Sequence, residues 1–140
     1  MAKTFKAAWP QTPKSGQVVV TGANTATDGT GTINTLLTAG ADGTRVSGLY
    51  AGARATVTAT AVRFFLSVDA GSTWTYLPHL DSLVPAFTLA NTTANGGVVT
   101  VIDRTTEADF LDLPASAVLG CTMAVALAGG MVFTALGHDY

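Results

Sequence analysis

The chain has 140 residues, and small side chains dominate it: threonine and alanine occur 23 times each and glycine 15 times. Only 11% of the residues are charged, less than half of the roughly 25% found in a typical soluble domain, and the mean hydropathy is +0.39. This composition excludes a disordered chain, because disorder requires low hydrophobicity and high net charge. The net charge of −2 does not indicate nucleic-acid binding, which favours a basic surface. The length suffices for one domain with a complete core.

The charges are unevenly distributed along the chain. All three lysines lie in the first fourteen residues: Lys3, Lys6 and Lys14. The part that follows is acidic, with four arginines against nine acidic residues. Two prolines and a glycine in residues 1–16 discourage regular structure, so we predict an extended arm over residues 1–16 and a single domain over residues 17–140. The arm is either a solvated terminus or a segment that reaches onto an acidic neighbour.

The first ten residues contain no apolar run of signal-peptide length, so we expect no secretion signal. The single cysteine, Cys121, has no partner in the chain for a disulfide and fits a reducing, cytoplasmic origin. Because it lies among alternating apolar residues, we predict that it is a core side chain and not a nucleophile.

After residue 16, short runs of β-branched and aromatic residues alternate with Gly, Asn, Asp and Pro, which is typical of a β-sandwich or barrel. The predicted strands lie near residues 17–21, 32–38, 44–50, 54–68, 73–78, 85–90, 97–103, 117–127 and 131–137. In the longest run the apolar residues change from odd positions, such as Val57, to even positions, such as Phe64. Such a change of buried face predicts a kink near Ala61–Arg63.

Residues 117–136 carry no charge over twenty positions, which is enough to cross a bilayer as a helix. Apolar side chains nevertheless alternate at period two, and Gly129-Gly130 is a turn signal, so we predict two strands and no membrane contact. The one helix-start signal begins at Thr105 and predicts at most two helical turns before Pro114.

Residues 67–74 match the Asp-box pattern S-x-D-x-G-x-T-W, which is known from sialidase propeller blades. The pattern predicts a tight hairpin in which Asp69 bonds backbone amides, Gly71 takes a positive φ and Trp74 packs beneath the turn. One such box and four arginines do not make a sialidase, so we infer a structural hairpin and no glycosidase.

The residue types needed for catalysis do not come together in this sequence. His79 and His138 lie in a proline-containing turn and near the C-terminus, without a serine or cysteine nucleophile motif beside them. Two histidines and one core cysteine fall short of a zinc site, and the glycine-rich stretches lack the ending of a phosphate-binding loop. We therefore predict a protein that is not an enzyme and takes no cofactor, metal or small-molecule substrate.

The small number of charged residues indicates a surface that another protein can bind, since few ions need to be desolvated when a partner binds. Aromatic residues and the basic arm offer anchors for such a contact. The residues predicted to make it are Lys3, Phe5, Lys6, Trp9, Lys14 and Tyr50.

Several segments resemble the small proteins encoded beside the major capsid protein in tailed phages. These are residues 40–46, 59–66, the 69–74 turn, 123–133 and 137–140, together about half of the chain. The resemblance is to capsid cement (decoration) proteins, with those of short-tailed phages the nearest in size.

This resemblance implies a jelly-roll-type antiparallel β-sandwich that binds the outside of an HK97-type shell and bridges neighbouring capsomers. The implied partners are the major capsid protein and a second copy of the chain, with a dimer favoured over a trimer. The implied location is the outer surface of the virion, after synthesis in the host cytoplasm. The alternative is a carbohydrate- or receptor-binding β-module of a phage fibre or spike, for which Trp74, Tyr76 and His79 form the local aromatic cluster.

Overall fold

The computed structural model describes residues 12–105 and 110–140, and strands dominate it. The described elements are β1 (Thr12–Val20), β2 (Asn34–Thr38), β3 (Thr44–Ala53), β4 (Thr60–Ser67), β5 (Thr75–Tyr76), the 3-10 turn η1 (Pro78–Leu80), β6 (Ser82–Val84), β7 (Val98–Ile102), β8 (Leu111–Leu113), β9 (Val118–Met123) and β10 (Met131–Asp139).

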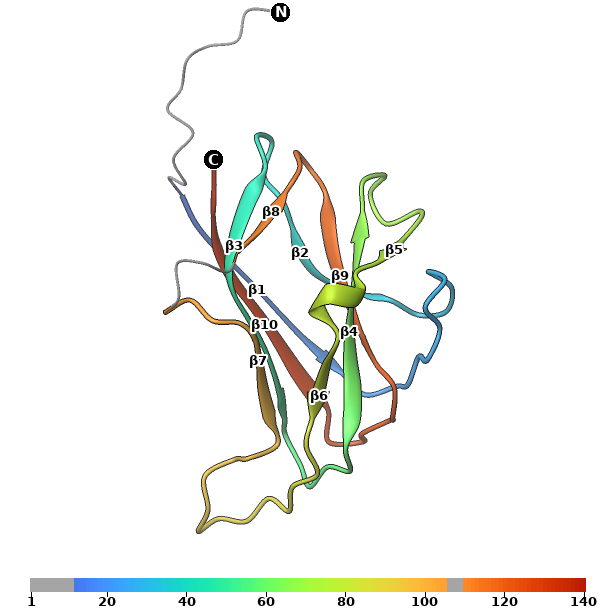
Figure 1. The fold of residues 1–140 in the computed structure, drawn as a ribbon, viewed down its shortest axis with the longest axis vertical. Helices are drawn as coiled ribbons and strands as arrows, with labels where there is room; N and C mark the ends of the chain where they lie inside the picture. Colours follow the sequence, from blue (N-terminus) through green and yellow to red (C-terminus); the bar gives the residue numbers. More distant parts are fainter. Residues whose placement is uncertain (1–11, 106–109) are drawn as a thin grey trace, which may run out of the picture.

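The strands form two packed antiparallel sheets (Figure 1). Sheet A has the order β1-β10-β3-β7, with β8 also paired to β3, and sheet B has the order β2-β9-β4-β5, with β6 also paired to β4. Successive long strands alternate between the sheets, which is the connectivity of a jelly roll. The predicted fold class, a jelly-roll-type antiparallel β-sandwich, is confirmed.

The core lies between the sheets. Alternate residues of each strand point inward and fill it. Phe64 of β4 and Phe133 of β10 meet edge to face across it, with ring centroids 5.9 Å apart. Cys121 is fully buried in the same cluster, as predicted, and its burial raises the pKa of the thiol. A thiol held protonated in this way is a packing group and not a nucleophile.

The sheet begins earlier in the chain than predicted. β1 pairs with β10 along its whole length, from Thr12 opposite Asp139 to Val20 opposite Met131. Residues 12–16, which the sequence assigned to the arm, are therefore part of sheet A, while residues 1–11 lie outside the described residues.

The predicted kink near Ala61–Arg63 is wrong. β4 keeps an unbroken register with β9, and residues 54–59 are an irregular connection that makes one isolated bridge, between Val57 and Phe87. The buried face changes because the chain leaves sheet A at the end of β3 and enters sheet B at the start of β4. The strand predicted near 85–90 is reduced to the same bridge.

The two helical turns predicted after Thr105 fall largely on residues 106–109, outside the described residues, and Leu111–Leu113 is strand β8 instead. Residues 117–136 contain β9, a turn and most of β10, as their alternation predicts. Across the described ranges, no helix is long and apolar enough to span a membrane.

Candidate docking surface

The Asp-box segment forms the predicted hairpin between β4 and β5. Asp69 accepts hydrogen bonds from the backbone amide of Thr73 at 2.8 Å and from its hydroxyl at 2.5 Å, while Ser67 donates to Asp69 at 2.7 Å. These hydrogen bonds, led by the Thr73 hydroxyl, lower the pKa of Asp69 to about 2. Gly71 has φ +87°, as a turn of this kind requires.

This hairpin helps to cover the outer face of sheet B. The Trp74 ring lies so close to Gly120 of β9 that a Cβ on this glycine would stand 2.6 Å from it. Phe65, which faces outward from β4, is fully buried and packs against Tyr76 at 5.5 Å between ring centroids. In Figure 1 the β1–β2 and β4–β5 connections both lie on the side of sheet B away from sheet A. The chain's own loops therefore cover much of this outer face.

The outer face of sheet A has a different character. The strand registers place its outward-facing residues in rows across the sheet. The first two rows are Val19, Val132, Gly52 and Val98, then Gln17, Thr134, Tyr50 and Thr100; the next two are Ser15, Leu136 and Gly48, then Pro13, His138 and Arg45. None of these residues of β1, β10, β3 and β7 is acidic. The face is apolar at one end, hydroxyl-rich in the middle and charged at the other end, where Asp112 of β8 lies opposite Arg45 and forms an ion pair with it.

Two open hollows lie in this face. One, of about 330 Å³, lies at the apolar end beside Tyr50, Gly52 and Val98. Val19 and Val98, at the two ends of the first row, are 45% and 49% exposed, with Val132 and Gly52 between them. The Tyr50 ring lies against Gly48, where a Cβ would stand 2.9 Å from it.

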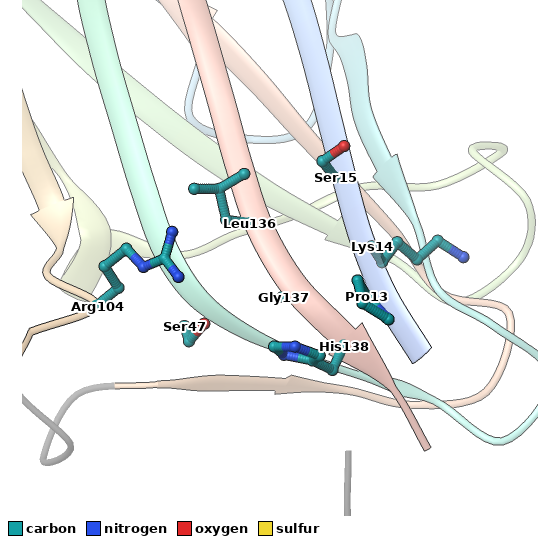
Figure 2. A pocket seen from close by; sticks show the side chains of 8 residues that line it. All are labelled: Pro13, Lys14, Ser15, Ser47, Arg104, Leu136, Gly137 and His138. Atoms are coloured by element: carbon teal, nitrogen blue, oxygen red, sulfur yellow. The ribbon is translucent and has the colours of Figure 1, made fainter. Parts of the chain in front are cut away.

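The second hollow, of about 240 Å³, lies at the charged end between β1, β10 and β3 (Figure 2). Arg104 reaches it from the segment after β7, and His138 stands beside it on β10. Lys14 points away from the hollow.

Of the six residues predicted to make the contact, the structure describes Tyr50 and Lys14. Tyr50 is half-buried on the outer face of sheet A, in the middle of the hydroxyl-rich row. Lys3, Phe5, Lys6 and Trp9 lie outside the described residues.

Lys14 lies near the start of β1, beside the last residues of β10. Its ammonium lies 3.2 Å from Asp139, which also accepts a hydrogen bond from Thr44. Burial raises the pKa of Asp139, but the hydrogen bonds from Thr44 and Lys14 outweigh this and hold that pKa below its usual range. In this structure Lys14 is thus engaged within the chain.

A second polar cluster ties the last residue of the chain to sheet A. Arg45 donates two hydrogen bonds to Asp112 of β8, at 2.9 and 3.1 Å, and its guanidinium lies 4.0 Å from the centroid of the Phe110 ring. Tyr140 donates to the same carboxylate at 2.8 Å. The hydrogen bonds from Arg45 lower the pKa of Asp112, so this ion pair largely neutralises the charge of Arg45.

The aromatic cluster considered for carbohydrate binding is mostly committed to packing. Trp74 rests on Gly120, and Tyr76 packs on Phe65 and donates a hydrogen bond to Asp81 at 2.5 Å. His79 alone of the three is exposed, on η1. Trp74 and Tyr76 are both partly buried, so packing within the chain takes up part of each ring.

Sequence reasoning found Tyr50 but not Val19, Val98, Leu136 or His138. The alternation of β10 was visible in the sequence, but only the pairing with β1 and β3 shows which of its two faces stays open. Across residues 12–105 and 110–140, no group of three or more His, Cys, Asp or Glu side chains is placed to hold a metal ion.

Comparison with known proteins identified no relative: no protein-family model, curated protein or solved structure matches this chain.

Proposed function

We propose that this protein is a capsid decoration (cement) protein that binds the outside of an HK97-type shell through the outer face of sheet A. The observation that carries the proposal is the contrast between the two sheets. Loops of the chain cover much of the outer face of sheet B, whereas the described residues leave the outer face of sheet A largely uncovered, and its one strand carboxylate, Asp112 of β8, is paired with Arg45. The segments that resemble phage cement proteins support the same role.

The residue types on the outer face of sheet A favour coverage by a partner protein. Valine, threonine and glycine residues cost little to desolvate, so a partner can cover the first three rows of this face without stripping water from ions. A rigid sandwich that bridges two capsomers opposes their separation, and many symmetric copies add small contributions together.

The proposal includes two further contacts. Residues 1–11, with Lys3 and Lys6, lap onto an acidic neighbouring subunit, and the chain associates with itself as a dimer. The proposed location is the outer surface of the virion. Deleting residues 1–11 tests the lap, because β1 begins at Thr12 and a longer deletion removes part of sheet A.

The central test is co-sedimentation with empty shells of the cognate major capsid protein. Tyr50→Asp places a carboxylate in the middle of the outer face of sheet A, and we expect shell occupancy to fall at least tenfold. The matched control is Leu83→Asp, since Leu83 is 62% exposed on β6 of the other sheet. Equal occupancy for the two variants contradicts binding through sheet A.

A wild-type protein that fails to sediment with the shells contradicts the decoration role itself. Binding of the same preparation to a glycan array then favours the fibre or spike module.

A further inference from the structure

The hollow at the charged end of sheet A has the size of a site for one side chain. Its volume of about 240 Å³ is below the roughly 300–1,000 Å³ of small-molecule sites. A metabolite of ordinary size has too little enclosure here, whereas one side chain of a partner protein fits. Apart from Lys14, which points away, the side chains that line the hollow are Pro13, Ser15, Ser47, Arg104, Leu136 and His138.

The polar groups of the hollow are hydrogen-bond donors. Arg104 supplies a guanidinium fork, and the imidazole of His138 carries an N–H donor whether it is neutral or charged. Ser15 and Ser47 add two hydroxyls. Figure 2 shows the Arg104 side chain extending over β3 toward β10. Because none of the described lining residues is a carboxylate, this set of donors suits a negatively charged group that only accepts hydrogen bonds.

Arg104 differs from the lysine and the other arginine near this end of the sheet, because those two already have partners. Arg45 pairs with Asp112, and the ammonium of Lys14 lies 3.2 Å from Asp139. Within the part of the chain that the structure describes, no carboxylate forms an ion pair with Arg104. Its guanidinium is therefore available to a carboxylate from outside the chain.

An irregularity in β3 brings one of the hydroxyls to the hollow. Gly48 and Val46 pair with consecutive residues of β10, so Ser47 between them is an extra residue on β3. Such a β-bulge re-aims a side chain and is over-represented next to active sites. Val46 is fully buried in the core, whereas Ser47 lines the hollow on the outer face. The bulge thus adds a hydroxyl to the set of donors around Arg104.

We propose that this hollow binds a carboxylate, the side chain of an aspartate or glutamate of the protein that covers the outer face of sheet A. The identity of that protein rests on the proposed function, whereas the preference for a carboxylate rests on the hollow alone. Nucleic-acid phosphate is disfavoured, because it needs a basic surface and the chain has a net charge of −2. Since the hollow is open to solvent, the ion pair adds modest affinity and mainly fixes the orientation of the partner.

Titration of the full chain with propionate, followed in heteronuclear NMR spectra, tests the hollow without a shell. Propionate has the carboxylate and the short stem of a glutamate side chain, and propionamide is its neutral isostere. At constant ionic strength, we expect propionate to shift the resonances of Ser15, Ser47 and the Arg104 Nε–H saturably, and propionamide to leave them in place. The absence of these shifts, equal shifts with propionamide, or tighter binding of inorganic phosphate overturns the proposal.

Two matched arginine variants locate the contact. Arg104→Gln removes the guanidinium from the hollow. Arg54→Gln removes the same charge from an exposed position just after β3, at the opposite end of the sheet, where Ala53 pairs with Met131. We expect Arg104→Gln to weaken propionate binding about fivefold and Arg54→Gln to leave it unchanged. Equal effects of the two variants overturn the proposal.

The same two variants, mixed with shells, test whether the shell supplies the carboxylate. We expect Arg104→Gln to lower shell occupancy more than Arg54→Gln does, and the difference to shrink at high salt. Equal occupancy of the two variants overturns the assignment of the hollow to a shell carboxylate and leaves the decoration role in place. Shells that do not bind the wild type contradict the decoration role instead, and the propionate titration then decides whether the hollow prefers a carboxylate.

Discussion

Replacing Gly16 with alanine tests whether β1 is packed in the sheet or is a loose arm, because only a packed β1 loses stability. A Cβ on Gly16 would stand 2.1 Å from the carbonyl oxygen of Leu36 on β2, far inside the ordinary contact distance. Because the obstacle is backbone, the two sheets must move apart locally, and overpacking of this kind costs about 1–3 kcal/mol. In an unpacked arm the same change restricts the folded and unfolded states alike and leaves the stability unchanged, because the stabilising effect of Gly→Ala needs a position that is ordered in the folded state.

Urea denaturation followed by circular dichroism measures this difference. The matched control is Gly22→Ala, because a Cβ on Gly22 meets no atom within 4 Å. We expect Gly16→Ala to lower the denaturation midpoint at unchanged slope, and Gly22→Ala to leave it constant or raise it slightly. If both variants are as stable as the wild type, β1 does not pack on β2 as described and the outer face of sheet A loses its edge strand.

Three further changes test the packing and electrostatics of the sandwich. Thr122→Val should raise the free energy of unfolding by roughly 1 kcal/mol, because the Thr122 hydroxyl is buried with no hydrogen-bond partner among the described residues; a lower melting temperature contradicts this. Gly120→Val should displace the Trp74 ring and destabilise the fold by roughly 1–3 kcal/mol, visible as a red shift of Trp74 emission in the Trp9→Phe background. Asp69→Asn should destabilise the fold at pH 7. Since the folded pKa of Asp69 is about 2 against roughly 3.9 when unfolded, the gap to the wild type in pH-dependent urea unfolding should close as pH falls from about 4 to about 2. A gap independent of pH excludes the carboxylate charge as its cause.

The periodicity of the sequence was sufficient to predict the sandwich, because alternation at period two survives wherever one face of a strand is buried. The Asp-box residues also predicted their hairpin, since its hydrogen bonds are local and need no partner strand. Residues 12–16 were misassigned for the opposite reason. Pro13 and Gly16 are typical of irregular chain, but Pro13 lies on an edge strand, where proline is tolerated, and Gly16 lies where the two sheets approach closely.

The candidate surface was harder to predict than the fold. Tyr50 was singled out as an aromatic anchor, and it lies on the outer face of sheet A. Lys14 was singled out by its charge, but its partner Asp139 is 125 positions away in the chain. A contact of that separation depends on the pairing of β1 with β10, and residue type alone carries no information about it.

The size of the outer face of sheet A limits what one copy can do. Four strands about 4.8 Å apart, over about seven residues at about 3.3 Å each, give a face of roughly 440 Å². A partner that covers it buries roughly 900 Å² in total, below the 1,200–2,000 Å² of stable specific interfaces. One such contact is therefore weak by itself, whether the partner is a shell or a second copy. Tight attachment then requires either a second contact, which the N-terminal segment can supply, or a repeating partner on which many copies bind side by side. When Tyr50→Asp is combined with deletion of residues 1–11, shell occupancy should consequently fall by much more than the sum of the losses in the two single variants.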